Sequence, residues 1–528
     1  MKHFSFYFIV FCVFCLKNSL SAQITDSILP DKPKICSSTI NIIQNDSSLL
    51  RFFKSLDSLK THKKNKITIL HIGDSHIQGD YMSRTIRYRM QEEFGERGRG
   101  LVFPYSFLNM YGPVDYKCTS NVPWENSRIF PKEKKFPVGP VGYTVGNNQP
   151  NLQALIDLKG APKNAWGALT NFENYPDNLF DQVSVVYSND SLDLPLMISS
   201  FSNNEDEGDY FQLPQNQEFD TRGFQIQTIK FPEAHQKLKI VVDTNRIFSE
   251  PVQIHGFIFE NTQRDGILYH MAGVGACQLN NFLRSSYFIS QTIALKPDLI
   301  IFSLGANESV SSGWDTLNYI IKYSQLLDDF KQKIPGISFL ITTPPDILYK
   351  GRLPIMKKQV QRALYEIAKN TNSPIWDLGE IMGGDYSNQI WHRAKLAGPD
   401  RIHFSPKGYD FQGLLLCEAL LSSYNKFASH PVNLQELEAD LNDYRSILSE
   451  NTQYFSESYP NKKNTSKSTE KTKLPKPVKG KQKTHKVQKG ESIYSISKKY
   501  GLDYNEVTKL NGFKKSTIIR PGQVIRLK

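Results

Sequence analysis

The sequence predicts an α/β fold with a parallel sheet, a long β-rich insertion and a small separate C-terminal unit. A β-branched run, 66–72, ends in a Gly-Asp-Ser turn and precedes a helical pattern over 81–94. A second apolar run, 298–304, is nearly continuous, as expected of a strand buried on both faces of a parallel sheet. After a basic stretch of low complexity, residues 484–528 regain hydrophobic periodicity.

Composition and charge indicate a globular protein with more than one folded unit. The chain has 528 residues, of which 39% are hydrophobic and 22% are charged. The formal net charge of +12 lies in the tail: residues 461–528 contain 19 Lys and Arg against 4 Asp and Glu, which leaves −3 for the remainder. The core is therefore not basic, and no nucleic-acid partner is expected. The composition of residues 459–483 predicts a linker. Its positive charge either attracts anionic wall polymers or membrane surfaces, or only keeps the segment solvated and extended as a spacer.

The N-terminus has the pattern of a secretory signal peptide, 1–22. Lys2 precedes an apolar run, 4–16, and small residues lead to Ala22. A transmembrane anchor is the alternative, but the run is shorter than the ~20 residues that cross a bilayer. We therefore expect a secreted or periplasmic protein without stable membrane insertion. The remaining cysteines form one or two disulfides or stay as free buried thiols, and their spacing fits no paired zinc site: Cys36, Cys118, Cys277 and Cys417.

Three short segments, far apart in the sequence, carry groups for hydrolysis. Ser75 stands between a predicted strand and a predicted helix, the context that presents a nucleophilic serine. Asn307 follows the second apolar strand. Asp400 and His403 precede Ser405-Pro406, which predicts the start of a helix that extends through 420. Because ligand groups gather at the carboxyl ends of strands in open α/β sheets, we expect these side chains to meet at one sheet edge.

Each segment has a structural explanation when taken alone. Asp and Ser often cap helices after a turn, and a loop histidine or aspartate is usually a solvated or turn-forming side chain. Together, however, they supply a nucleophile, a base and an acid that orients the base. Serine needs such a base to take its proton before it attacks a carbonyl carbon. No metal cluster or phosphate loop is visible, so no cofactor is expected.

These blocks resemble the SGNH, or GDSL-like, hydrolases, which begin with a Gly-Asp-Ser turn and end with an Asp-x-x-His pair. The resemblance implies a three-layer α/β/α core. It also implies that Ser75 is the nucleophile, that His403 is the general base and that Asp400 fixes the imidazole tautomer. The oxyanion hole would consist of the backbone N–H groups of Ser75 and Gly275 and the side-chain amide of Asn307.

Some details of the resemblance stay open. Gly273 is the alternative to Gly275 as the glycine donor, and Gly275 has a simpler explanation in a flexible turn or in close helix packing. Two residues depart from the family pattern: His76 replaces the usual Leu after the serine, and Glu308 replaces the usual Asp after the asparagine. Neither change removes a group that the mechanism needs.

The insertion, 101–262, contains several runs of strand length separated by turn residues: 182–187, 194–200, 224–231, 237–242 and 252–259. We expect a β-sandwich-like domain. Its position is similar to that of the carbohydrate-binding-module-like unit set into the core of peptidoglycan O-acetylesterases. The alternative is a packing elaboration without a binding role. Some of its aromatic residues either stack on sugar rings or fill a core: Tyr105, Phe107, Tyr111, Trp124 and Trp166.

The C-terminal unit predicts a strand (484–488), a helix (493–500), a second helix (505–511) and a closing strand (523–527). It resembles a LysM domain in Val487-Gln488-Lys489-Gly490-Glu491-Ser492 and in Ile519-Arg520-Pro521-Gly522-Gln523. LysM modules bind N-acetylglucosamine-containing glycans, chiefly peptidoglycan, in a shallow groove between two loops. The groove would be formed by Gly490, Glu491, Ser492, Ile493, Ile518, Ile519, Arg520, Pro521 and Gly522. A similar unit without a ligand is the alternative.

The sequence thus predicts a secreted, wall-associated serine esterase that removes O-acetyl groups from peptidoglycan and is held there by its LysM unit. The alternatives are an esterase for other acylated polysaccharides or lipids, an acetyl transferase, and a non-catalytic wall-binding protein. The expected domains are a signal peptide (1–22), an N-terminal segment (23–64), a core in two parts (65–100 and 263–430) with an insertion (101–262), a helical segment (431–458), a linker (459–483) and a LysM domain (484–528).

Overall fold

The computed structural model describes residues 35–130, 134–158, 177–188, 195–202, 209–213, 224–243, 251–285, 287–458, 484–488, 491, 493–513 and 519–527. The expected signal peptide and linker, and Trp166, lie outside these residues. In the described part of the chain, no helix is both long enough and apolar enough to span a bilayer. The four cysteines that follow the expected signal peptide are buried and form no disulfide, so they are free thiols, the second of the two expectations from the sequence.

The core is built on a six-stranded sheet with the order β1-β17-β16-β15-β2-β14. All neighbouring strands in it are parallel except β1, which pairs with β17 in the antiparallel sense. The sheet contains β1 (Ile43–Gln44), β2 (Lys66–Gly73), β14 (Gly266–Gly273), β15 (Leu299–Ser303), β16 (Ser338–Thr342) and β17 (Ile375–Trp376). Nearly every residue of its four long strands is buried, which explains their continuous apolar runs.

The order of the strands determines where a ligand can bind. The chain passes from β2 to β14 on one side and then to β15 on the other, so the winding direction changes beside β2. In open α/β sheets, the crevice at such a switch point, outside the carboxyl ends of the strands, is the usual ligand site. Gly73, Gly273 and Ser303 lie in register at the ends of these three adjacent strands. The segments that follow them leave the sheet at one edge, as expected from the sequence.

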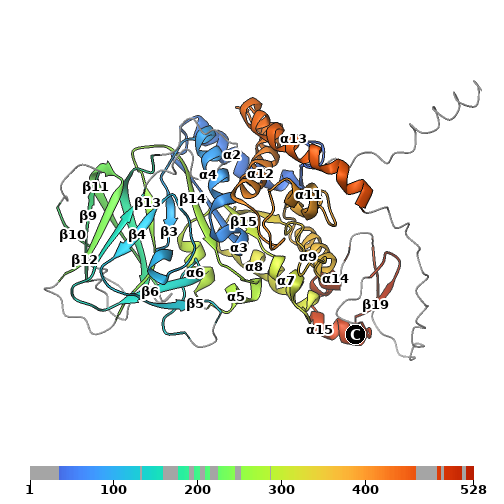
Figure 1. The fold of residues 1–528 in the computed structure, drawn as a ribbon. Coiled ribbons are helices and arrows are strands. Elements are labelled where there is room, and N and C mark those ends of the chain that lie inside the picture. The colour runs from blue at the N-terminus through green and yellow to red at the C-terminus, as the bar shows by residue number, and fades with distance from the viewer. Residues whose placement is uncertain are drawn as a thin grey trace, which may run out of the picture.

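Helices pack around this sheet (Figure 1). Helix α4 (Tyr81–Phe94) contacts β14 and α12 (Pro406–Phe427), and α13 (Gln435–Ser458) contacts the outer side of α12. Helix α12 begins where the sequence predicts, because the Ser405 hydroxyl accepts the backbone N–H of Gly408 at 3.2 Å and Pro406 opens the first turn. The other helices of the core are α2 (Leu50–Lys60), α3 (Ser75–Gln78), α5 (Leu279–Leu283), α6 (Phe288–Ala294), α7 (Ala306–Val310), α8 (Thr316–Lys333), α9 (Lys357–Asn370), α10 (Leu378–Ile381) and α11 (Asn388–Arg393), with the short 3-10 turn η1 (Asp46–Leu49) before α2.

Between α4 and β14 the chain forms two antiparallel sheets, which Figure 1 shows at one end of the molecule. One sheet has the order β10-β9-β12-β7-β4, and the other has the order β11-β8-β13-β6-β5 with β3 paired to β13. Their strands and one 3-10 turn are β3 (Gly100–Val102), η2 (Tyr105–Leu108), β4 (Lys117–Ser120), β5 (Glu125–Arg128), β6 (Tyr143–Asn147), β7 (Gln153–Asp157), β8 (Phe180–Ser188), β9 (Leu196–Phe201), β10 (Phe211–Gln212), β11 (Gln225–His235), β12 (Lys237–Val242) and β13 (Val252–Glu260). All five runs expected from the sequence are strands.

A buried charge network ties this insertion to the core. Arg87 on α4 pairs with Asp80 at 2.9 Å and with Asp115 of the insertion at 2.7 Å. Arg99 pairs with the same two carboxylates at 2.7 and 2.6 Å. Burial acts to raise the pKa of Asp80, but the two guanidinium groups outweigh it and lower that pKa. Two cations and two anions compensate one another, as charges buried this completely require. We call these four residues the charge quartet.

The C-terminal unit has the expected order of elements. Strands β18 (Thr484–Lys486) and β19 (Val524–Arg526) pair in the antiparallel sense, with α14 (Ile493–Lys499) and α15 (Tyr504–Leu510) between them in sequence. Its small core contains Val487, Ile493, Ile496, Tyr504, Val507, Ile525 and Leu527, and Leu317 and Ile321 of α8 pack against it.

Candidate active site

Ser75 and His403 are separated by 328 positions in the chain and lie within hydrogen-bonding distance, with 3.0 Å between Ser75 Oγ and His403 Nε2. Ser75 opens α3 directly after β2, and His403 lies in the loop before α12. His403 Nδ1 is 2.7 Å from Asp400 Oδ2. The side chains of both Asp400 and His403 are 46% exposed, so these groups are accessible from solvent.

The turn that contains Asp400 holds its carboxylate beside the His403 ring. Its Oδ1 accepts the backbone N–H groups of Ile402 at 3.0 Å and of His403 at 2.9 Å. Burial acts to raise the pKa of Asp400, but these bonds and the one from the His403 ring outweigh it and lower the pKa. A carboxylate at Nδ1 requires the proton on that nitrogen, so Nε2 carries the lone pair that accepts the Ser75 hydroxyl proton.

The two expected oxyanion donors beyond Ser75 both have partners in this structure. The Asn307 side-chain amide donates to the Cys277 carbonyl at 3.0 Å and is 3.4 Å from Asp74 Oδ2. The backbone N–H of Gly275 donates to Gln78 Oε1 at 2.5 Å. The alternative glycine, Gly273, packs so closely on α3 that a Cβ there would lie 2.3 Å from the Gln78 backbone nitrogen. Close packing therefore accounts for Gly273.

Gln78 was not recognised from the sequence, yet it connects three parts of the site. Besides accepting the bond from Gly275, it donates through Nε2 to the Tyr111 carbonyl at 2.7 Å and accepts from the Tyr143 hydroxyl at 3.3 Å. Tyr111 and Tyr143 belong to the insertion. Nothing in the sequence marks a glutamine three residues after the serine, because its partners are remote in the chain.

Two buried carboxyl groups lie beside the nucleophile turn. Asp74 caps α3 by accepting the His76 backbone N–H at 3.0 Å, and Glu308 accepts the Leu279 backbone N–H at 2.8 Å. Burial raises the pKa of Asp74 to about 7, and the neighbouring Glu308 contributes in the same direction. Burial likewise raises the pKa of Glu308 to about 7. Both groups therefore change their charge near neutral pH.

His76, which replaces the usual leucine after the serine, packs against His403. Its ring centroid is 5.5 Å from that of His403, and its Nδ1 is 3.0 Å from the Tyr409 hydroxyl. Burial, reinforced by the proximity of His403, lowers the pKa of His76 to about 3. The His76 ring is therefore neutral at physiological pH, and it packs against the His403 ring at an angle of 37°.

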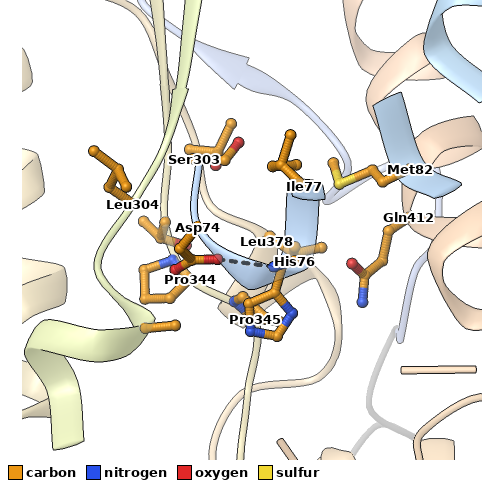
Figure 2. A pocket seen from close by; sticks show the side chains of 13 residues that line it. Asp74, His76, Ile77, Met82, Ser303, Leu304, Pro344, Pro345, Leu378 and Gln412 are labelled. Atoms are coloured by element: carbon orange, nitrogen blue, oxygen red, sulfur yellow. Dashed lines mark hydrogen bonds between the residues drawn. The ribbon is translucent and has the colours of Figure 1, made fainter. Parts of the chain in front are cut away.

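Figure 2 shows a small cavity on the inner side of the nucleophile turn, with Asp74, His76 and Gln412 among the side chains around it. Its volume of 20 Å³ has room for about one water molecule and is far below the ~300 Å³ at which ligand pockets begin. Ser75 and His403 do not line it. A substrate must therefore reach Ser75 from the exposed side of the triad.

The expected LysM groove residues fall on two neighbouring loops where they are described. Glu491 accepts the Gln488 backbone N–H at 2.8 Å and lies 2.5 Å from His485 Nε2. The backbone N–H of Gly522 donates to the Val487 carbonyl at 2.7 Å, which brings the second loop beside the first. Ile493 is buried in the unit's own core. Gly490, Ser492 and Ile518 lie outside the described residues.

A parallel sheet with a serine, a histidine and an aspartate in line at its switch point is an arrangement that α/β acyl hydrolases use. Comparison with known families agrees with this class. The GDSL-like Lipase/Acylhydrolase family model matches residues 260–411, and the LysM domain model matches residues 485–528. The chain therefore contains a GDSL-like acylhydrolase domain, which supports an esterase, followed by a LysM domain.

Individual relatives cover very different shares of the chain. The probable peptidoglycan endopeptidase LytE of Bacillus subtilis is 56% identical over 45 residues, which is 8% of this chain and only 13% of LytE. A structure described as a peptidoglycan O-acetylesterase in action is 20% identical and covers 71% of this chain and 96% of its own, with a TM-score of 0.57, which shows a shared fold. A lipase/acylhydrolase from Enterococcus faecalis is 16% identical over 32% of this chain and 81% of its own, with a TM-score of 0.25 that adds nothing further.

Proposed function

We propose that this protein is a serine carbohydrate esterase that removes O-acetyl groups from peptidoglycan. The observation that carries the proposal is the line of three groups at the switch point: Ser75 Oγ 3.0 Å from His403 Nε2, and His403 Nδ1 2.7 Å from Asp400. A non-catalytic wall-binding protein has no need of a serine, a correctly oriented imidazole and a carboxylate in this order.

In the proposed reaction, His403 takes the proton of Ser75 as the serine oxygen attacks the ester carbonyl. The negative charge that develops is met by the backbone N–H of Ser75, the amide of Asn307 and the backbone N–H of Gly275, and losing one such donor costs ~10²- to 10³-fold in rate. Gly275 can contribute only after its bond to Gln78 is exchanged for one to the oxyanion. His403 then gives that proton to the sugar oxygen as its bond to the acyl carbon breaks, which frees the sugar hydroxyl and leaves an acetyl-serine. Water, deprotonated by His403, attacks the acetyl-serine, and acetate leaves as the proton returns to Ser75.

Two features support a wall glycan as the substrate. The LysM domain belongs to a module class that binds such glycans, and tethering the catalytic domain to its polymer raises the effective substrate concentration. His403 and Asp400 are about half exposed, so the site is open to solvent, which suits a small acyl group on a long polymer. We further propose that the two sheets of the insertion form a sandwich-like glycan-binding domain within 101–262. The boundaries of the core and of the LysM domain are proposed to be those expected from the sequence. Residues 1–22 are proposed to direct the protein out of the cytosol.

Acetate release from O-acetylated peptidoglycan by the purified protein tests the proposal. Ser75→Ala should lower the rate at least ~10³-fold, whereas Ser58→Ala, a matched change on α2, should not. A Ser75→Ala protein that keeps its activity would refute the assignment of the nucleophile. Faster release from acetyl-xylan or short-chain lipids than from the wall would redirect the proposal to other acyl esters, and acetyl transfer to an added sugar would make the protein a transferase.

A further inference from the structure

The structure separates the aromatic residues of the insertion into core and surface positions. Tyr105 and Trp124 are buried, and Phe107 stacks on Trp124 with ring centroids 4.9 Å apart. Tyr111, by contrast, is 55% exposed. Of the aromatic residues of the insertion that the sequence singled out and the structure describes, Tyr111 alone is largely exposed to solvent.

Tyr111 is the outer end of a line of rings that leads to the triad. Its ring stacks on Tyr81 at 6.0 Å and 28°, and Tyr81 stacks on Tyr409 at 6.0 Å and 7°. The Tyr409 hydroxyl meets His76, whose ring supports His403. Tyr111 is thus connected to His403, the proposed general base, through a series of ring contacts.

Two contacts fix Tyr111 over the helix that Ser75 opens. Its backbone oxygen accepts a bond from Gln78 Nε2 at 2.7 Å. Its hydroxyl lies above Gly79, where a Cβ would be 2.4 Å from that oxygen, so only glycine admits the ring at this position. Gly79 follows the one-turn helix that Ser75 opens, so the Tyr111 hydroxyl lies by the end of that helix, with the serine at its start ~6 Å away along the axis.

We propose that Tyr111, supported by Tyr81, is a stacking platform for a pyranose ring of the acylated glycan, next to the sugar whose ester enters the triad. The axial C–H groups of a pyranose form an apolar face, and an aromatic face with its negative quadrupole attracts such polarised C–H groups. Because packing already holds the ring in place, little ordering entropy is lost on binding. This inference rests on the proposed esterase function and adds a residue that selects the substrate.

The first test compares a small ester with a polymer. Tyr111→Ala should lower the ratio of kcat/KM on O-acetylated glycan to kcat/KM on p-nitrophenyl acetate about five- to tenfold, and Tyr111→Phe or Tyr111→Trp should restore it. Alanine keeps the backbone oxygen that holds Gln78, so the oxyanion side of the site is preserved. Phe427→Ala is the matched control: this ring is 39% exposed and stacks on Phe53, but it ends α12, ~30 Å along that helix from the His403 end.

The second test does not depend on the natural ester. Soluble chitooligosaccharides and de-O-acetylated muropeptides should inhibit p-nitrophenyl acetate hydrolysis competitively, with an inhibition constant about five- to tenfold higher in Tyr111→Ala than in the wild type or Phe427→Ala. Equal inhibition of the wild type and Tyr111→Ala, or no inhibition of either, would overturn the platform. If Tyr111-dependent inhibition occurs without acetate release from wall material, the platform stands and the proposed function fails.

Discussion

The side chain of Gln78 accepts the backbone N–H of Gly275, with 2.5 Å between Oε1 and the nitrogen. The glutamine oxygen thus accepts the N–H that the proposed mechanism assigns to the developing oxyanion. The same glutamine donates to the carbonyl of Tyr111, so one side chain links the nucleophile helix, a loop of the β-rich insertion and a proposed oxyanion donor.

Gln78→Glu should therefore reduce the rate. A carboxylate beside Gly275 holds the N–H more tightly and repels the negative charge that forms on the substrate, and one lost oxyanion donor costs ~10²-fold. Steady-state kinetics with p-nitrophenyl acetate should show the loss mainly in kcat. A variant with wild-type kcat would mean that Gly275 does not serve the oxyanion. Circular dichroism melts should accompany the kinetics, since the glutamine also anchors the Tyr111 loop.

Asp400→Asn should impair catalysis more than it impairs folding. The amide can donate to His403 Nδ1 and so favour the wrong tautomer, for which losses of ~10⁴ in kcat are known in triads of this kind. Because hydrogen bonds lower the pKa of Asp400, the wild-type group stays ionised below its ordinary range. Protonation of Asp400 should therefore not produce the acid limb of a pH–rate profile measured above pH 4. A loss of less than tenfold would show that Asp400 does not orient the base.

The buried Glu308 should make folding stability depend on pH. Its pKa rises from 4.5 to about 7 on folding, so the folded state binds the proton more tightly than the unfolded state does. The corresponding stability is fully present below pH 4.5 and is lost as the pH rises through 7, a change on the order of 3 kcal/mol. Urea unfolding at several pH values should show a smaller decline for Glu308→Gln. Some decline should persist, because Asp74 has a similarly raised pKa. Identical slopes would contradict the burial of an ionisable Glu308.

Arg99→Met should destabilise the core strongly, because it leaves the two buried aspartates of the charge quartet with Arg87 alone. Removing one partner from a buried ion network typically costs about 3–5 kcal/mol. Lys426→Met removes a cation from an exposed pair with Asp46, 2.8 Å apart, and should cost at most about 1 kcal/mol. Chemical denaturation of both variants tests the contrast. Equal costs would mean that the quartet contributes no more than a surface pair.

The elements that bear the site were predictable because their signals are local. The apolar runs before Gly73 and before Gly305 correspond to β2 and β15, and Ser405-Pro406 marks the start of α12. Each of these patterns depends on residues within a few positions of one another. The expectation that Ser75 and His403 meet followed from the rule that functional groups gather at the carboxyl edge of such a sheet.

Other parts of the site had no local signal. Gln78 and Tyr111 are ordinary residues until the fold brings a glycine N–H and a second tyrosine to them. The substitution of His76 for a leucine was visible, but its packing against His403 was not. The charge quartet shows the same limit, since arginine side chains are usually solvated and these two are fully buried.

The sequence by itself determined the strands and helices that carry the site, the order of elements in the C-terminal unit and the identity of the three groups proposed for catalysis, because hydrophobic period, capping and turn residues act over short stretches of chain. Only the tertiary structure decided which N–H groups are already engaged, which aromatic rings face solvent and which carboxyl groups are buried deeply enough to hold a proton near neutral pH. Hydrogen bonding, exposure and desolvation depend on atoms that are distant in the chain and adjacent only after folding.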